Sequence, residues 1–212
     1  MTTNRHAVLI ADVIGSRTRK DLRAVLAKRL AAATRTHLKA QIRLPYAVTA
    51  GDEFQTILAA RINIPELIFD LRSKLRPLRL RIGIGFGQVS GRVQQPVNLM
   101  GGEAFQRARR ALEGVKQDNS KYDVLTAFQS GNEIFDSTAN LIYALQDTLL
   151  LKVTNKQWDT IQAYRADRRL GIAARILKLN RSTVSRNLKR GYFWQIERTI
   201  SAMDRLIRAS KV

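Results

Sequence analysis

The sequence predicts an α+β protein in two parts, a ferredoxin-like βαββαβ palm domain over residues 1–150 and an all-α helix-turn-helix module over residues 151–212. Three observations predict it. Short apolar runs alternate with amphipathic helical patterns in the first part, whereas only helical patterns occur in the second. A Gly-Asp step joins two of the apolar runs as a tight hairpin. The basic residues are concentrated in the second part.

Hydrophobic periodicity predicts each element of the first part. In a βαββαβ unit we expect the first and last strands to lie centrally and the helices to cover one face of the sheet. The apolar pattern of the closing helix includes Leu141 and Leu145. The expected elements are a strand at 6–12, a helix at 18–40, a hairpin at 46–60, a helix from Pro65 to Pro77, a strand at 78–87, a helix at 103–112, a strand at 122–128 and a closing helix at 132–150.

Two carboxylates are expected at the ends of core strands. Asp12 ends the apolar run of the first strand, and Asp52 follows Gly51 at the tip of the hairpin. Hard cations such as Mg²⁺ or Mn²⁺ take one or two carboxylates and leave their other positions to water and phosphate. The sequence therefore predicts that Asp12 and Asp52 bind a divalent cation that carries a nucleoside triphosphate. We expect the turn at Gly15 and Ser16 to donate backbone N–H groups to that phosphate.

Composition excludes several classes of function. The chain has no cysteine, which rules out disulfides, thiolate zinc sites and cysteine nucleophiles, and it has only two histidines. Its apolar stretches are too short for a membrane span, and the first residues do not have the pattern of a signal peptide. The sequence predicts a soluble, cytoplasmic protein.

Charge is divided unevenly along the chain. Lys and Arg number 37 against 17 Asp and Glu, which gives a net charge of +20. Residues 151–212 hold 15 basic and 4 acidic residues, a net charge of +11 on 62 residues. Such a high density of positive charge has no role in packing, so we expect this part of the chain to bind a polyanion. Double-stranded DNA is therefore the predicted partner of the second part.

Residues 170–188 have the pattern of a helix-turn-helix. Ala174 is the small residue expected where the two helices cross, and Val184 is expected to pack beneath it. Asn180 is the predicted cap of the second helix. Lys178 takes the place of the Gly that is usual in the turn, which requires either a negative φ or modest strain.

The second helix of this motif carries short polar and basic side chains, the types that bond base edges and phosphates. A capping box at Thr154 and Gln157 is predicted to start the module. A long amphipathic helix at 192–207 follows, and its apolar stripe either completes the module or pairs two chains in a homodimer. The predicted DNA-binding residues are Arg181, Ser182, Thr183, Ser185, Arg186, Asn187, Lys189 and Arg190.

Several motifs carry a resemblance to known families. Asp12-Val13-Ile14-Gly15-Ser16, Gly51-Asp52-Glu53-Phe54 and Arg81-Ile82-Gly83-Ile84-Gly85 resemble, in order and spacing, the palm domain of class III nucleotidyl cyclases and GGDEF proteins. Together with the 102–109 segment and the C-terminal part, the whole chain resembles the SatD family of bacterial and phage proteins. The resemblance implies a cyclase-like palm joined to a helix-turn-helix module.

The cyclase resemblance implies roles for single residues. Asp12 and Asp52 take the positions of the two metal-binding aspartates, and Arg109 lies in the helix that supplies a transition-state arginine, with Arg107 and Arg110 beside it. Asp12, Asp52 and Arg109 are thus the candidate catalytic residues. The residues implied to bind nucleotide phosphates are Val13, Ile14, Gly15, Ser16 and Gly51.

Three functions remain open on these observations. The first is a DNA-binding, transcriptional regulator whose palm senses a nucleotide and Mg²⁺. The second is a metal-dependent nucleotidyl cyclase or oligonucleotide synthase that its helix-turn-helix localises to DNA. Val48 weakens this second function because many cyclases keep a purine-reading Lys there. The third is a non-catalytic scaffold with a degenerate palm.

Overall fold

Strand β1 (Arg5–Val13) lies in the middle of a five-stranded sheet in the computed structural model. The structure describes residues 5–16, 21–38, 40–60, 62–91, 93, 96–122 and 124–212. The strand order is β2-β3-β1-β4-β5, where β4 and β5 are parallel and the other pairs are antiparallel. The protein is therefore an α+β protein, as the sequence predicts, and its sheet is mixed. The other strands are β2 (Ala47–Ala50), β3 (Glu53–Ile57), β4 (Leu80–Gln88) and β5 (Thr126–Gln129).

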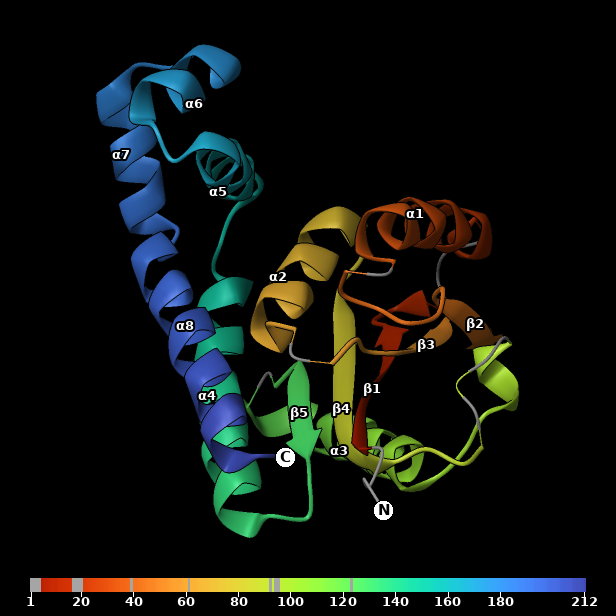
Figure 1. Ribbon diagram of the computed structural model, residues 1–212. Coiled ribbons are helices and arrows are strands. Elements are labelled where there is room, and N and C mark those ends of the chain that lie inside the picture. The colour runs from red at the N-terminus through yellow and green to blue at the C-terminus, as the bar shows by residue number, and fades with distance from the viewer. Residues whose placement is uncertain are drawn as a thin grey trace.

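Helices cover both faces of this sheet, whereas the sequence predicted one covered face (Figure 1). On one side Leu9, Ala11 and Phe54 pack against α1 (Leu22–His37) and α2 (Ile64–Leu75). On the other side Val8, Ile10 and Ile57 pack against α3 (Glu103–Tyr122). Consecutive residues of β1 and β3 therefore alternate between two largely apolar layers, so neither face of these strands is turned to solvent.

Helix α3 approaches β4 as closely as a helix backbone can. A Cβ atom built on Gly83 or Gly85 would lie 2.2 Å from the carbonyl oxygen of Ala108 or Ala104, respectively. Only glycine fits at these two positions of β4. Their function is to admit the neighbouring helix, which brings the polar side chains of α3 close to the ends of β1 and β3.

Two boundaries differ from the sequence-based expectation. The strand expected at 122–128 begins only at Thr126, because α3 continues to Tyr122 with no proline to stop it. The helix expected at 18–40 spans Leu22–His37, and residues 17–20 lie outside the described residues. A short 3₁₀ helix, η2 (Val97–Leu99), precedes α3.

Helix α4 (Glu133–Leu151) buries a different face from the expected one. Phe135, Ala139 and Tyr143 enter the core, while Leu141 and Leu145 are each 64% exposed. The polar residues of the buried face explain this choice: the Asn140 side-chain amide pairs with the N–H and carbonyl of Phe128, and Asp147 accepts from the N–H of Leu125 at 2.9 Å. These hydrogen bonds pair backbone N–H and carbonyl groups at the outer edge of β5, which no other described strand covers.

Four helices follow, which we call the helical unit: α5 (Asn155–Asp167), α6 (Leu170–Leu177), α7 (Arg181–Arg190) and α8 (Phe193–Ser210). The predicted capping box is present at Thr154 and Gln157. Asn180 caps α7, accepting from the N–H of Thr183 at 2.8 Å. In place of the negative φ that was one expectation, Lys178 has φ 55°, a left-handed conformation that costs a non-glycine residue roughly 1–2 kcal/mol.

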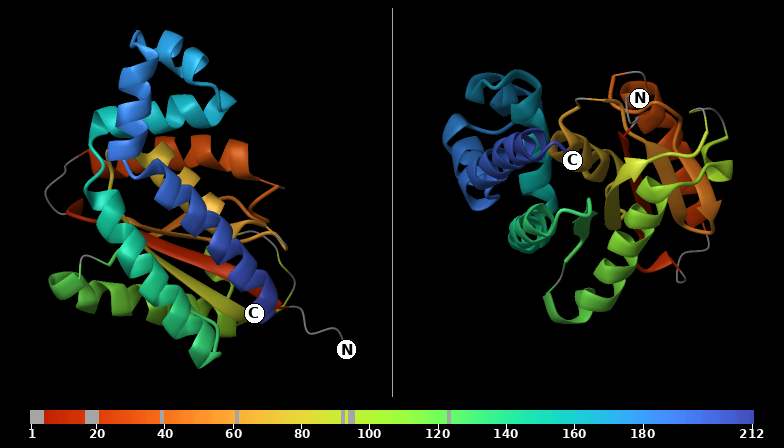
Figure 2. Two further views of the ribbon diagram at one scale, coloured as in Figure 1. Left: turned by 90° about the vertical axis from the view of Figure 1, so that its left-hand side faces the viewer. Right: turned by 60° about the horizontal axis from the view of Figure 1, so that its bottom comes forward.

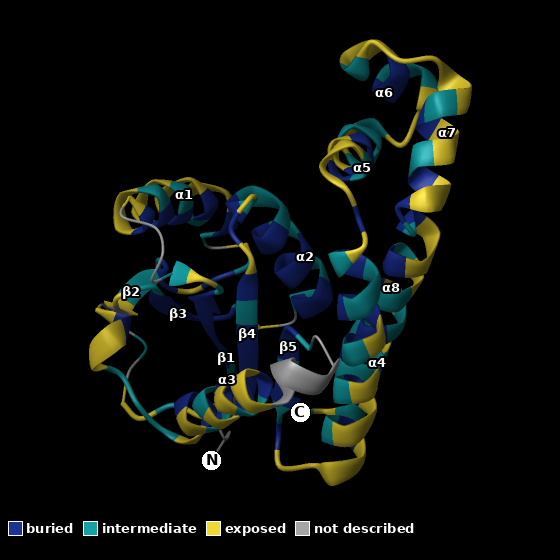
Figure 3. Ribbon diagram, turned by 180° about the vertical axis from the view of Figure 1, so that it is seen from behind, coloured by how far each residue is buried: buried dark blue, intermediate teal, exposed yellow. Residues whose placement is uncertain are grey.

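The helical unit is not independent of the part that precedes it, which we call the sheet unit (residues 5–151). Helix α8 runs alongside α4, and Met203 is fully buried in the main core of the sheet unit (Figures 1 and 2). Phe69 of α2 in turn belongs to the core of the helical unit, with its ring 5.1 Å from that of Trp158. Buried residues lie on each of the three helices α2, α4 and α8 (Figure 3).

Candidate functional site

The end of β1 carries a cluster of charged side chains, which we call the charge cluster: Asp12, Glu53, Arg81, Arg109 and Lys116. The pairing of Ala11 with Phe54 sets Asp12 level with Glu53 on the neighbouring strand. Both side chains lie on the α3 face, because Ala11 and Phe54 belong to the core on the opposite face.

Each buried carboxylate of the charge cluster is paired with cations. The Oδ2 atom of Asp12 lies 2.9 Å from Nζ of Lys116 and 3.5 Å from Nη1 of Arg81. Glu53 accepts two hydrogen bonds from Arg109, and the hydrogen bond to Glu53 raises the pKa of Arg109 above its ordinary value. The charge of Asp12 is therefore already compensated by protein cations, before any metal ion binds.

Two atoms of the cluster, Oδ1 of Asp12 and Nε of Arg81, are buried and have no hydrogen-bond partner among the described residues. An uncompensated carboxylate oxygen in the interior is costly and suits a cation or a donor group of a ligand. Yet within the described ranges no group of three or more His, Asp or Glu side chains gathers to hold a metal ion. With Lys116 and Arg81 on the other oxygen of Asp12, the described residues do not fit a divalent cation bound by protein alone.

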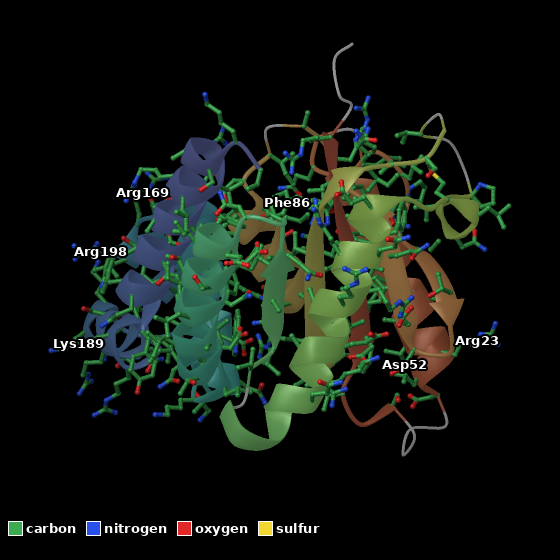
Figure 4. All side chains as sticks on the ribbon, turned by 90° about the horizontal axis from the view of Figure 1, so that it is seen from below. Arg23, Asp52, Phe86, Arg169, Lys189 and Arg198 are labelled. Atoms are coloured by element: carbon green, nitrogen blue, oxygen red, sulfur yellow. The ribbon has the colours of Figure 1, made fainter. Side chains whose placement is uncertain are left out.

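The other predicted palm residues are placed as follows. Asp52 is half-buried at the hairpin tip, after Gly51, whose φ is 59° (Figure 4). The N–H of Ile14 donates to the carbonyl of Arg79 at 2.9 Å, so this predicted phosphate donor is already used. Val13 is a buried residue of β1, and Gly15 and Ser16 follow in the turn. The structure therefore brings Asp12 and Arg109 into one cluster but leaves little free backbone in the predicted cradle.

The three arginines of α3 point to different places. Arg109 reaches Glu53, Arg107 donates to the carbonyl of Phe86 at 2.7 Å, and Arg110 lines a groove beside β5. Glu53, Arg81 and Lys116 were missed by the reasoning from sequence. Lys116 follows Arg109 by seven residues, two helical turns, and would have been found had the helix been extended past residue 112.

The second candidate site is the outer surface of α7. Arg181, Arg186, Lys189 and Arg190 are exposed, and within the described part of the chain none of them forms an ion pair with a carboxylate. Figure 4 shows Lys189 on the outer side of the helical unit, on the side of the molecule opposite Asp52. Helix α7 contains no acidic residue, so its cations stay uncompensated.

The turn before α7 fixes how this helix is presented. The left-handed conformation of Lys178 lets the N–H of Leu179 donate to the carbonyl of Ala174 at 2.9 Å, which ends α6. Ala174, Val184 and Leu188 are buried between the helices. Four predicted DNA contacts have partners within the protein: Asn187 donates to Oγ1 of Thr160 at 3.1 Å, Ser182 donates to the cap residue, and Arg186 donates to Oγ1 of Thr183 at 3.4 Å.

Comparison with known families decides where the chain belongs. The model of the SatD family matches residues 6–198, nearly the whole chain. The chain belongs to the SatD family. A search of the curated proteins gave no match for this SatD sequence.

Two solved structures, both of a bacterial light-regulated adenylyl cyclase, are similar to the SatD chain at 15% sequence identity. The first has a TM-score of 0.44 over 59% of this chain and 42% of the other, so the SatD chain spans less than half of that protein. The second has a TM-score of 0.38 over 58% of this chain and 74% of the other. None of the helices in the described ranges is long and apolar enough to cross a membrane.

Proposed function

We propose that this SatD protein binds double-stranded DNA through α7, with the helical unit acting as a helix-turn-helix module. The observation that carries the proposal is the exposed, acid-free surface of α7 with four cations. Cations that meet no carboxylate in the protein release the counterions of a phosphate backbone on binding, which favours association. A regulatory role in transcription is the function we assign to this binding.

The geometry of the α6–α7 pair supports the proposal. Three residues join the helices, and the buried pair Ala174 and Val184 holds them together. Arg181 and Ser182 lie in the first turn of α7, where the helix dipole favours a phosphate. Ser185 is exposed and has no hydrogen-bond partner among the described residues, so it is the best-placed side chain of α7 to contact a base edge.

The test is the salt dependence of affinity for duplex DNA, measured by fluorescence anisotropy between about 50 and 200 mM salt. We expect Arg186→Gln and Lys189→Gln each to weaken binding to all sequences alike and to reduce the salt slope by about one. Arg23→Gln, on the exposed surface of α1, is the matched control and should leave binding unchanged. An affinity that is flat across salt, or equal for Lys189→Gln and Arg23→Gln, would overturn the proposal.

A second function, nucleotide binding at the charge cluster, is favoured by the unpartnered Oδ1 of Asp12. Its cations, Arg81, Arg109 and Lys116, can exchange a carboxylate for a phosphate. Thermal unfolding with ATP or GTP, each with and without Mg²⁺, tests it: a ligand at a hundred times its dissociation constant adds about 2.7 kcal/mol of stability. We expect Asp52→Asn to abolish any Mg²⁺-dependent part of the shift. If none of these nucleotides raised the unfolding temperature, both nucleotide sensing and cyclase activity would be excluded.

A further inference from the structure

A cavity of 260 Å³ lies at the junction of the sheet and helical units. Its walls come from the end of α2, from the start of β4 and from the chain between α4 and α5, with Trp158 of α5 completing it. We call this the junction cavity. Because its lining residues belong to both units, a molecule bound in it would contact both.

The polar part of the junction cavity is cationic. Arg72, Arg76 and Arg79 line it, and among the residues that the structure describes no Asp or Glu does. Arg72 is only 7% exposed, and its Nη1 and Nη2 atoms are held by Asp147 and Thr126, but its Nε has no partner among the described residues. Arg72 therefore places a buried cation at the wall, where its charge attracts an anion in the cavity.

Arg79 adds an uncompensated charge at the rim. The charge of Arg76 is balanced by Asp159, with a distance of 3.0 Å between Nη1 and Oδ1, and that of Arg72 by Asp147. The exposed side chain of Arg79 makes neither an ion pair nor a hydrogen bond to any described residue. The lining therefore has one net positive charge that none of the described side chains neutralises.

The remaining wall of the junction cavity is apolar and aromatic. Leu80 and Leu150 lie on it, and the Trp158 ring stands beneath the Arg76 guanidinium, 5.4 Å from ring centroid to Cζ. The volume is slightly below the range of about 300–1,000 Å³ that small-molecule sites take. Such a site admits a single ring with one charged group and excludes a polymer.

We propose that the junction cavity binds a small organic anion, an aromatic or aliphatic ring that carries one carboxylate or phosphate. The ring lies against Trp158 and the leucine wall, and the anionic group meets the uncompensated guanidinium of Arg79, beside Arg72 and Arg76. This site is separate from the charge cluster and from α7. Its ligand holds α2 and α5 together and so stabilises the contact between the two units.

Fluorescence of Trp158 tests the proposal directly. The chain has two tryptophans, and Trp194 is 55% exposed, so Trp194→Phe leaves Trp158 as the sole reporter in an otherwise full-length protein. The probe is phenyl phosphate, compared with inorganic phosphate and with benzyl alcohol, which supply the anion and the ring separately. We expect a saturable change with phenyl phosphate and at least about tenfold weaker binding of either part alone.

Arg79→Gln in the Trp194→Phe background should weaken phenyl phosphate binding about tenfold, as expected for the loss of a charge-assisted hydrogen bond, while Arg23→Gln should not change it. Arg79 is exposed, so its substitution leaves folding intact. The proposal is overturned if phenyl phosphate gives no saturable change up to about 10 mM, or if inorganic phosphate binds equally well. Equal binding by the Arg79→Gln and Arg23→Gln variants would also overturn it. No DNA is present, so the result is independent of the proposed function.

Discussion

Asp12 and Asp52 occupy different environments, although the sequence suggests one shared role. Asp12 is buried, and its charge is compensated by Lys116 and Arg81, whereas Asp52 is half-buried at a turn and contacts no cation among the described residues. Removing one partner of a buried pair leaves the other charges uncompensated. The two residues therefore differ in what they contribute to stability.

We predict that Asp12→Asn lowers the free energy of unfolding by about 1–3 kcal/mol, less than for a fully buried pair because Lys116 is partly exposed. Asp52→Asn should change it by no more than about 0.5 kcal/mol, as for an ordinary surface substitution. Urea denaturation of both variants measures this. Unfolding of the protein by Asp52→Asn would show instead that Asp52 is a structural turn residue.

Asp70 gives a pH-dependent contribution to stability. Burial alone would raise the pKa of its carboxyl, but the hydrogen bond from His37 and the nearby Lys74 ammonium lower that pKa below its ordinary value. A lowered folded-state pKa means that the contribution is complete above the unfolded pKa of about 3.9 and is lost as pH falls through the folded value.

We therefore expect the difference in free energy of unfolding between the native protein and Asp70→Asn to shrink between about pH 5 and pH 3. Denaturant titrations at the two ends of this range measure it. A difference that stays constant over the range would mean that the His37–Asp70 bond does not shift the pKa of Asp70.

For helices and strands, the periodicity of the sequence predicts whether an element exists and of which type it is better than it predicts which other elements it contacts. The order of strands and helices up to residue 151 follows the expected one, because each element has a clear hydrophobic period. The buried face of α4 could not be predicted, since it depends on Asn140 and Asp147 meeting the edge of β5. For the same reason Glu53 was missed: its partner Arg109 is 56 residues away.

The glycines of β4 offer a test of the α3 contact. We predict that Gly85→Ala lowers the free energy of unfolding by about 3 kcal/mol or more, because its Cβ would meet backbone atoms of α3, which cannot move as a side chain can. Gly114→Ala in α3 itself, where nothing lies within 4 Å of an added Cβ, is the matched control and should be neutral or stabilising. Similar denaturation midpoints for the two variants would contradict the close approach.

At the scale of the whole molecule, the sheet and helical units share their cores. The sequence placed a boundary at residue 150, yet α8 returns to the sheet unit, and its stripe of Ile196, Ile200 and Met203 is buried within the chain. That stripe is accounted for by internal packing, so a homodimer would require another surface. Hydrophobic periodicity alone could not predict that α8 packs on the sheet unit, because an apolar stripe does not indicate which surface covers it.

We predict that Met203→Ala lowers the stability of both units together, by about 2–5 kcal/mol, in a single unfolding transition. Far-UV circular dichroism and Trp158 fluorescence should report the same midpoint, since Trp158 lies in the helical unit and Met203 contacts the sheet unit. Two separated transitions would show that the units fold independently.

Hydrogen exchange of the full chain with and without duplex DNA at low salt is the sharpest test of DNA binding through α7, because it locates the contact. We predict slowed amide exchange in residues 178–190, the turn and α7, and unchanged exchange at the hairpin of β2 and β3. Protection at the hairpin and the charge cluster, with none in α7, would contradict it.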